Sequence, residues 1–103
     1  MTDDEALAIM MALADTGRFE IFRKVLERPA LAAAELSAGK AASTTSHHLK
    51  KLEQASILRS TRVAKTKQYA VDKRTLLAFA GWVNGCVGAA TFNEEVYQLL
   101  DSD

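Results

Sequence analysis

The sequence predicts a mainly α-helical fold that carries one β-hairpin. Apolar residues recur at helical spacing through most of the chain, whereas residues 57–71 are rich in β-branched and aromatic side chains. The chain has 103 residues and about half of them are apolar, which predicts a single globular domain over residues 1–103. A domain of this size buries only a modest core, so oligomerisation is expected.

Four helices are expected before the hairpin. In the first, acidic residues precede an apolar stripe of helical spacing, and Asp15 or Thr16 can cap the second. Pro29 ends the second helix, and Gly39 suits a left-handed turn after the short, alanine-rich third helix. The expected spans are 3–14, 15–28, 30–39 and 42–55.

The spacing of apolar residues changes after the fourth helix. Strands are expected over Ile57–Val63 and Lys67–Val71, joined by a turn that contains no glycine. These strands form the predicted hairpin.

Two more helices are expected after the hairpin. Asp72 can cap a helix from Lys73 to about Ala89. Thr91 and Glu94 have the spacing of a capping box, which predicts a separate last helix over about Phe92–Leu100. The predicted order is therefore four helices, a hairpin and two helices.

The fourth helix contains the segment "STTSHHLKKL", residues 43–52, and has two different faces. The polar face holds Ser43, Ser46, His47 and Lys50. The opposite, apolar face holds Thr45, Leu49 and Leu52, with His48 beside it. The two histidines therefore point in different directions and would be poor joint ligands for one metal ion. We expect His48 to be partly buried beside Leu52.

The net charge is zero, but the charges are unevenly distributed. Residues 39–74 contain nine basic and two acidic side chains, a net charge of +7. Residues 1–38 contain seven acidic and four basic side chains, and residues 75–103 contain four acidic and no basic ones. A basic middle between acidic ends indicates a surface that faces a polyanion.

The third and fourth helices, joined through "SAGK", have the pattern of a helix-turn-helix, whose second helix enters the major groove of DNA. Short hydroxyl side chains allow that helix to approach base edges, and a basic hairpin beside it would be a wing. The predicted DNA-binding residues are Ser43, Thr44, Ser46, His47, Lys50, Arg62, Lys65 and Lys67. For Lys51, phosphate contact and simple solvation both stay open.

Several segments resemble a known family in their order. "ALADTGRFEIFRKVL", "AAEL" and "STTSHHLKKLEQASIL" are followed by a basic hairpin that ends at Tyr69. Over roughly residues 6–72 this order resembles the ArsR/SmtB family of winged helix-turn-helix repressors. Family members usually have proline, glutamine and glycine where this chain has Gly17, Ala42 and Ser56.

The resemblance implies a fold, a function and partners. It implies a winged helix-turn-helix with a DNA-binding core over residues 15–72, dimeric through terminal helices over 3–14 and 73–100. It further implies a cytoplasmic homodimer that binds an inverted-repeat operator in double-stranded DNA and represses transcription. Such repressors release DNA when an inducer binds, so an unidentified small-molecule inducer is an expected partner.

The metal sites of that family are not found in this sequence. Arsenic- and cadmium-type members carry a Cys-x-Cys before the recognition helix, where this chain has "LAAAEL". Zinc- and nickel-type members carry Asp and His pairs on the helix after the wing, where this chain has Asp72 and no histidine. Because metals of these classes need several such ligands, we expect no metal site and no cofactor.

The chain has one cysteine, Cys86, so a disulfide within the chain is excluded, which suits the cytoplasm. The favoured interpretation is a small, buried, apolar side chain. The alternative is a redox switch, in which the Cys86 side chains of two subunits form a disulfide.

Small residues form a stripe on the helix after the wing, at Ala78, Gly81, Gly85 and Gly88. Each glycine inside a helix costs about 1 kcal/mol relative to alanine, so the stripe needs an explanation. The favoured one is close contact between helices at a dimer interface. The others are a pocket for a small inducer beside Trp82, Phe79 and Phe92, and a break in the helix near Gly85–Gly88, where the glycines would mark a bend.

Other classes of function have less support. The sequence contains no nucleophile–base pair, carboxylate dyad or phosphate-binding loop, so an enzyme is not expected. Its start, "MTDDEAL", lacks the basic residues of a signal peptide. No apolar run is expected to reach the ~20 residues of a membrane span, so no membrane partner is predicted. The alternative to DNA binding is a winged helix that serves as a protein-interaction module.

Overall fold

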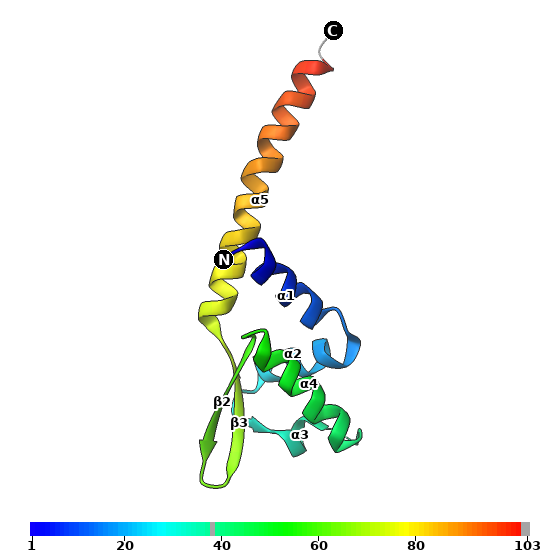
Figure 1. The fold of residues 1–103 in the computed structure, drawn as a ribbon, viewed down its shortest axis with the longest axis vertical. Helices are drawn as coiled ribbons and strands as arrows, with labels where there is room; N and C mark the ends of the chain where they lie inside the picture. The colour runs from blue at the N-terminus through cyan, green and yellow to red at the C-terminus, as the bar shows by residue number, and fades with distance from the viewer. Residues whose placement is uncertain (38, 102–103) are drawn as a thin grey trace.

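The computed structural model describes residues 1–37 and 39–101, and these form five helices and three strands (Figure 1). In chain order the elements are α1 (Asp3–Leu13), α2 (Thr16–Glu27), β1 (Leu31–Ala32), α3 (Ala33–Ser37), α4 (Ala42–Gln54), β2 (Leu58–Val63), β3 (Thr66–Val71) and α5 (Lys73–Leu100). The predicted fold class, mainly helical with a hairpin wing, is confirmed. Residue 38, inside the predicted third helix, and residues 102–103 lie outside the described residues.

Side-chain caps fix the starts of the first two helices. Thr2 and Glu5 form a capping box: the backbone N–H of each donates to the other's side chain, at 2.9 and 3.1 Å. Asp15 caps α2, as predicted, because its carboxylate accepts a hydrogen bond from the backbone N–H of Arg18 at 3.0 Å. The helix ends before Pro29, also as predicted.

A short strand, β1, stands where the start of the third helix was predicted. Leu31 and Ala32 pair antiparallel with Tyr69 and Gln68 of β3, so the sheet has the order β1-β3-β2. The predicted helix over residues 30–39 was therefore wrong at its start. The physical reason is that β3 has an open edge, and two residues that pair with it satisfy backbone groups of both segments.

The wing is the hairpin of β2 and β3, close to its predicted bounds. Its two-residue turn holds Ala64 at φ 56°, in the left-handed region that favours glycine. The residues that share one face of the hairpin are Leu58, Ser60 and Arg62, paired with Val71, Tyr69 and Lys67. Because Leu58 and Tyr69 are buried, this face is turned toward the core.

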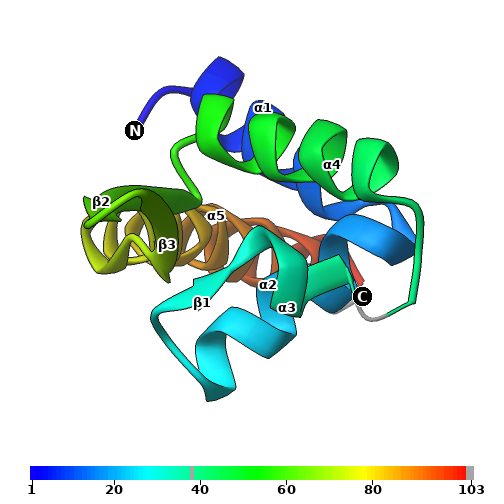
Figure 2. The same cartoon turned by 90° about the horizontal axis from the view of Figure 1, so that it is seen from below.

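The core lies where α1, α2, α3 and α4 meet the sheet, and the view along the long axis in Figure 2 shows these elements grouped together. Its largest fully buried side chains are Ile9, Val25, Leu36, Leu49, Leu52, Ile57 and Leu58. Thr45, Leu49 and Leu52 are buried, so the predicted apolar face of α4 is confirmed.

A left-handed turn at Ser56 ends α4. Ser56 has φ 61°, and its N–H donates to the carbonyl of Glu53 at 2.9 Å. The N–H of Ile57 donates to the carbonyl of Leu52 at 3.0 Å, which completes a Schellman motif. Ser56 therefore occupies a backbone conformation that glycine adopts more easily, and glycine is the usual residue of the resembled family at this position.

After Asp72, which caps it as predicted, α5 runs unbroken through Lys73–Leu100. The prediction of two separate helices was wrong. Thr91 does not begin a new helix, because its hydroxyl donates to the carbonyl of Val87 one turn earlier, at 2.9 Å. An unbroken α5 also excludes the explanation of the glycine stripe as a break in the helix.

Most of α5 projects beyond the core, as Figure 1 shows. None of its 28 residues is buried, and its exposed large apolar side chains include Leu77, Val87, Phe92 and Tyr97. The radius of gyration is 18.1 Å, against about 13 Å for a compact domain of this length. Cys86 is also exposed, so its interpretation as a buried side chain was wrong for the single chain.

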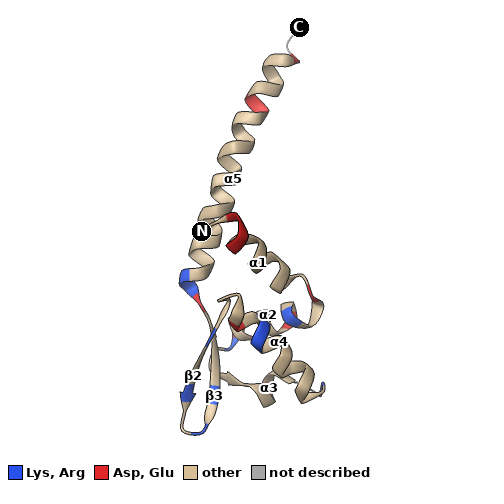
Figure 3. Cartoon of the chain, in the orientation of Figure 1, with Lys and Arg blue, Asp and Glu red and all other residues tan. Residues whose placement is uncertain are grey.

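The apolar character of α5 exceeds what the sequence pattern suggested. Figure 3 shows no Lys, Arg, Asp or Glu along most of its length, and none stands between Arg74 and Glu94. By length and composition alone, α5 could cross a membrane, so the expectation that no run is long enough was wrong.

One junction joins α1 to α5. The indole Nε1 of Trp82 donates to the carboxylate of Asp3 at 2.8 Å. Phe79 stacks against Trp82, with ring centroids 6.1 Å apart and ring planes 13° apart, and also packs against the core. These contacts hold the first third of α5 against α1 and the core.

Candidate DNA interface

The polar face of α4 is open to solvent along its whole length. The four residues predicted on it, Ser43, Ser46, His47 and Lys50, are exposed, and so is Thr44, the fifth residue of α4 predicted to bind DNA. The three wing residues predicted to contact DNA, Arg62, Lys65 and Lys67, are exposed as well. The fold therefore leaves every predicted DNA-binding residue accessible to a partner.

The two histidines of α4 have different surroundings, as the helical spacing predicted. His47 is exposed, whereas the side chain of His48 is only 17% exposed and its Nε2 lies 3.8 Å from the carboxylate of Asp15. A Cβ atom placed on Gly17 would come within 2.7 Å of that same Nε2. His48 thus packs over the bare backbone of Gly17, at the start of α2.

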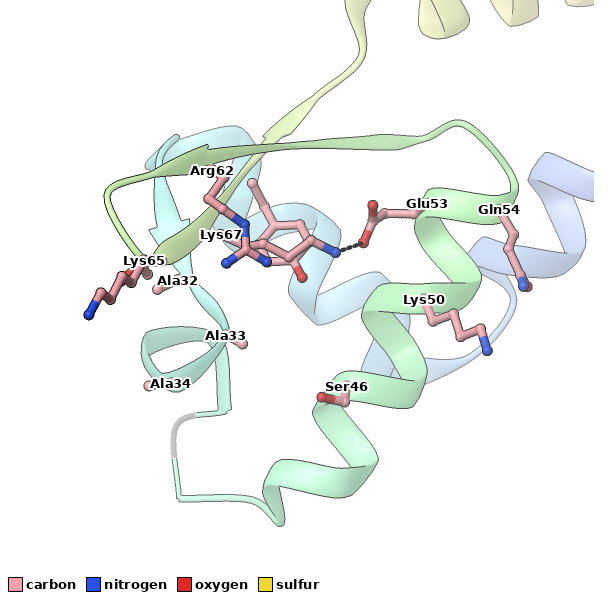
Figure 4. A pocket seen from close by; sticks show the side chains of 12 residues that line it. Ala32, Ala33, Ala34, Ser46, Lys50, Glu53, Gln54, Arg62, Lys65 and Lys67 are labelled. Carbon is pink, nitrogen blue, oxygen red and sulfur yellow. Dashed lines mark ion pairs between the residues drawn. The ribbon is translucent and has the colours of Figure 1, made fainter.

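A groove of about 860 Å³ separates the wing from α3 and α4 (Figure 4). The side chains that line it include Ser46, Lys50, Arg62, Lys65 and Lys67. Five of the eight predicted DNA-binding residues are thereby brought to one surface.

The cations of this groove differ in their partners. Lys67 Nζ lies 3.8 Å from the carboxylate of Glu53, drawn as a dashed line in Figure 4. Lys50, Arg62 and Lys65 form no ion pair with any residue in the described part of the chain. Their charges are therefore free to neutralise an external anion.

Glu53 and Tyr69 are two of the residues lining this groove that the sequence pattern did not indicate. Glu53 lies on α4, one turn beyond the predicted reading face, and Tyr69 is buried beneath the wing. Burial, and then the negative charge of Glu53, raise the pKa of Tyr69 above its ordinary value. The alternation of inward and outward residues on β2 and β3 is the signal that could have placed them together.

No cluster of three metal-ligating side chains occurs in the described residues. His48 lies 3.8 Å from the carboxylate of Asp15, but no third ligand joins this pair in the described residues, and His47 is exposed whereas His48 is partly buried. The surface therefore offers hydroxyls, an imidazole and ammonium or guanidinium groups, which are the usual donors to phosphate and base edges.

Known proteins resemble this chain in structure more than in sequence. No protein-family sequence model matches it, and no curated protein is similar enough in sequence to match. An ArsR-like transcriptional regulator from Rhodococcus sp. RHA1 has a similar structure, with a TM-score of 0.85, 17% identity, and coverage of 94% of this chain and 92% of that one. The chain has the ArsR-type winged-helix fold.

Two further solved structures are similar to this chain and support the assignment of its fold. A DNA-binding domain of Mb0332 from Mycobacterium bovis, described as a homodimeric winged helix-turn-helix, matches with a TM-score of 0.65 and 17% identity. The structural match covers 91% of this chain and 93% of the Mb0332 domain. A predicted DNA-binding transcriptional regulator from E. coli matches with a TM-score of 0.63 and 26% identity, over 79% of this chain and 88% of that one. These relatives are described as transcriptional regulators, in agreement with the expectation that the chain is not an enzyme.

Proposed function

We propose that this protein is a sequence-specific transcriptional repressor that binds an inverted-repeat operator as a homodimer. The observation that carries the proposal is the joint exposure of the polar face of α4 and the basic wing around one groove. In that arrangement Ser43, Thr44, Ser46 and His47 would contact base edges in the major groove. Lys50, Arg62, Lys65 and Lys67 would contact phosphates.

The dimer would use α1 and α5, and residues 15–72 would form the DNA-binding core. In support, α5 leaves large apolar side chains open to solvent, with Leu77 61% and Val87 56% exposed. Apart from the backbone of the helix itself, no atom of the described residues lies within 4 Å of a Cβ atom placed on Gly81, Gly85 or Gly88, so packing in the described chain does not require these glycines. A second α5 packed against the stripe would both explain the glycines and bury the apolar surface.

The dimer sets the spacing of its two recognition helices. Two copies of α4 about 34 Å apart would match half-sites one turn of DNA apart. A repressor that acts in this way works in the cytoplasm, at the bacterial chromosome. We propose that it needs no metal, and that its release from DNA is caused by an unidentified small molecule.

The exposure of Cys86 supports a second way of switching the repressor. Cys86 lies on α5 between Gly85 and Gly88 and is open to solvent. In a dimer whose axis passes close to Cys86, oxidation would join two Cys86 side chains and lock the two helices together. Cys86 lies about 100° around the helix from Gly85, so this dimer would differ from one centred on the stripe.

The test is binding of the purified protein to DNA from its own promoter region across a salt series. Three unpaired groove cations per subunit in a dimer correspond to about six neutralised phosphates, and thus to a slope of about −5 in log affinity against log salt. The same series with added reductant tests Cys86, and with added chelator tests the expected absence of a metal. Binding without sequence preference or salt dependence would favour the protein-interaction module.

Two substitutions separate base contacts from phosphate contacts. His47→Ala should weaken operator binding by about 10-fold or more and leave binding to unrelated DNA unchanged. Lys65→Ala should weaken binding to every sequence and reduce the salt slope by about one per subunit. Operator affinity equal to that of the unaltered protein in His47→Ala would contradict the role given to α4.

A further inference from the structure

The groove beside the wing contains one carboxylate among its cations. Of the described residues that line it, four are basic, namely Lys50, Arg62, Lys65 and Lys67, and only Glu53 is acidic. An acidic side chain on a surface that faces phosphates weakens DNA binding, so its presence there indicates a different role. Its contacts indicate what that role is.

Glu53 connects α4 to both strands of the wing. Its Oε2 accepts a hydrogen bond from the hydroxyl of Ser60 on β2, at 3.0 Å. Its Oε1 lies 3.8 Å from Nζ of Lys67 on β3. The Glu53 side chain is 29% exposed and Lys67 48%, so the pair lies at the surface and remains open to competition from solvent and from external anions.

The register of the hairpin explains why a carboxylate is useful here. Arg62 and Lys67 are direct cross-strand partners on the face of the hairpin that is turned toward α4. Two like charges at opposed positions destabilise a hairpin, because their Cβ atoms are only about 5 Å apart. The charge of Glu53 offsets this repulsion.

We propose that Glu53 is a positioning residue that fixes the wing against the recognition helix and restrains Lys67 until a phosphate competes for it. The proposal rests on the DNA-binding function proposed above. When DNA binds, Lys67 exchanges the carboxylate of Glu53 for a phosphate, so its net contribution to affinity is small. Arg62 and Lys65, which have no ion pair in the described residues, then supply most of the attraction from the wing.

The first test is the salt dependence of binding to a mixed-sequence DNA duplex about three helical turns long, a length that exceeds one dimer site. Glu53→Gln keeps an oxygen that can accept from Ser60 but removes the negative charge. We expect tighter binding, by up to about fivefold per subunit, as for the gain of one exposed ion pair. The salt slope should become steeper by about one per subunit.

A matched control has the same change in net charge. Glu27 pairs with Arg23 on α2, at 3.8 Å, and does not line the groove. Glu27→Gln should therefore leave the slope as it is in the unaltered protein. The double variant Glu53→Gln with Lys67→Gln should also return to the unaltered slope, because the released cation is then missing.

The second test separates the positioning role from the charge. Glu53→Ala and Ser60→Ala remove the hydrogen bond between α4 and β2, whereas Glu53→Gln retains it. Hydrogen exchange of the β2–β3 amides should accelerate most in Glu53→Ala, which loses both the hydrogen bond and the charge, and less in Ser60→Ala and in Glu53→Gln, which each lose one of the two.

Two outcomes have different meanings. A Glu53→Gln slope equal to that of Glu27→Gln would overturn the role of Glu53 and leave DNA binding intact. Salt-independent binding by the unaltered protein would overturn the proposed function itself.

Discussion

The DNA-binding core buries its apolar side chains within one chain, whereas the distal part of α5 leaves many of them exposed to solvent. The core buries Leu49, Leu52 and Ile57 completely within one chain. The distal part of α5 is as apolar but leaves Phe92 65% and Leu99 76% exposed. The comparison teaches that the first region buries its apolar surface within one chain, whereas the second leaves it exposed, as is usual for a surface that binds a partner.

The largest expected effect comes from the core. Leu52→Ala removes a side chain with no exposed surface, from the Schellman motif at the end of α4. We expect the free energy of unfolding to fall by about 2–5 kcal/mol. Urea unfolding monitored by circular dichroism would measure this. The loss should be the same at every protein concentration, and a loss that depended on concentration would contradict a self-sufficient core.

Gly85→Leu, in the distal part of α5, should weaken the proposed dimer without destabilising the single chain. Leucine is a better helix former than glycine by nearly 1 kcal/mol, and open space surrounds the Cβ position in the single chain. In the proposed dimer, however, overpacking costs about 1–3 kcal/mol per site and occurs twice. Sedimentation equilibrium should therefore show a dissociation constant raised about 30-fold or more. An unchanged dimer would remove the stripe from the interface.

A third prediction concerns the contact of His48 with Gly17, between α4 and α2. Gly17→Ala should destabilise the protein by about 1 kcal/mol, because the new methyl group would press on Nε2 of His48. In a His48→Ala background the same change should be neutral or stabilising. A double-mutant cycle should give a coupling of about 1–2 kcal/mol. Additive effects would show that the imidazole moves away freely.

Ser56→Gly should raise the stability of the core by up to about 1 kcal/mol. At φ 61° serine is strained and glycine is not, although glycine is also more flexible in the unfolded chain. Thermal unfolding would measure the change. Ala8→Gly is a suitable control, because Ala8 is exposed inside α1, where glycine costs about 1 kcal/mol relative to alanine.

The smallest expected effect is on the acid dependence of stability. The backbone N–H of Arg18 holds the pKa of Asp15 below its ordinary value of 3.8. This carboxylate therefore stabilises the fold fully above pH 3.8, and that contribution is lost as pH falls through the lowered value. Asp15→Asn keeps the cap without the charge. Between about pH 5 and pH 2, the urea midpoint of the Asp15→Asn variant should fall less than that of the unaltered protein, because the variant lacks one group that takes up a proton.

Local patterns predicted the core well. The two faces of α4, the hairpin and the caps at Asp15 and Asp72 follow from spacing and residue type, and each was found. The DNA contacts of the exposed residues remain predictions.

Features that depend on distant residues were missed. β1 forms only because the edge of β3 lies beside it, and Glu53 meets Ser60 and Lys67 only through the register of the wing. The unbroken α5 was missed for a different reason. Thr91 and Glu94 match a helix start, but the preceding turn already provides the backbone partners that a start would lack.

The junction of α1 and α5 has a practical consequence. Trp82 is the only tryptophan in the sequence, and its indole N–H is bonded to Asp3. All intrinsic indole fluorescence therefore originates where the two helices proposed to form the dimer meet. Emission wavelength and quenching by iodide can report subunit exchange, inducer binding or undocking of α1 in real time, with no label attached.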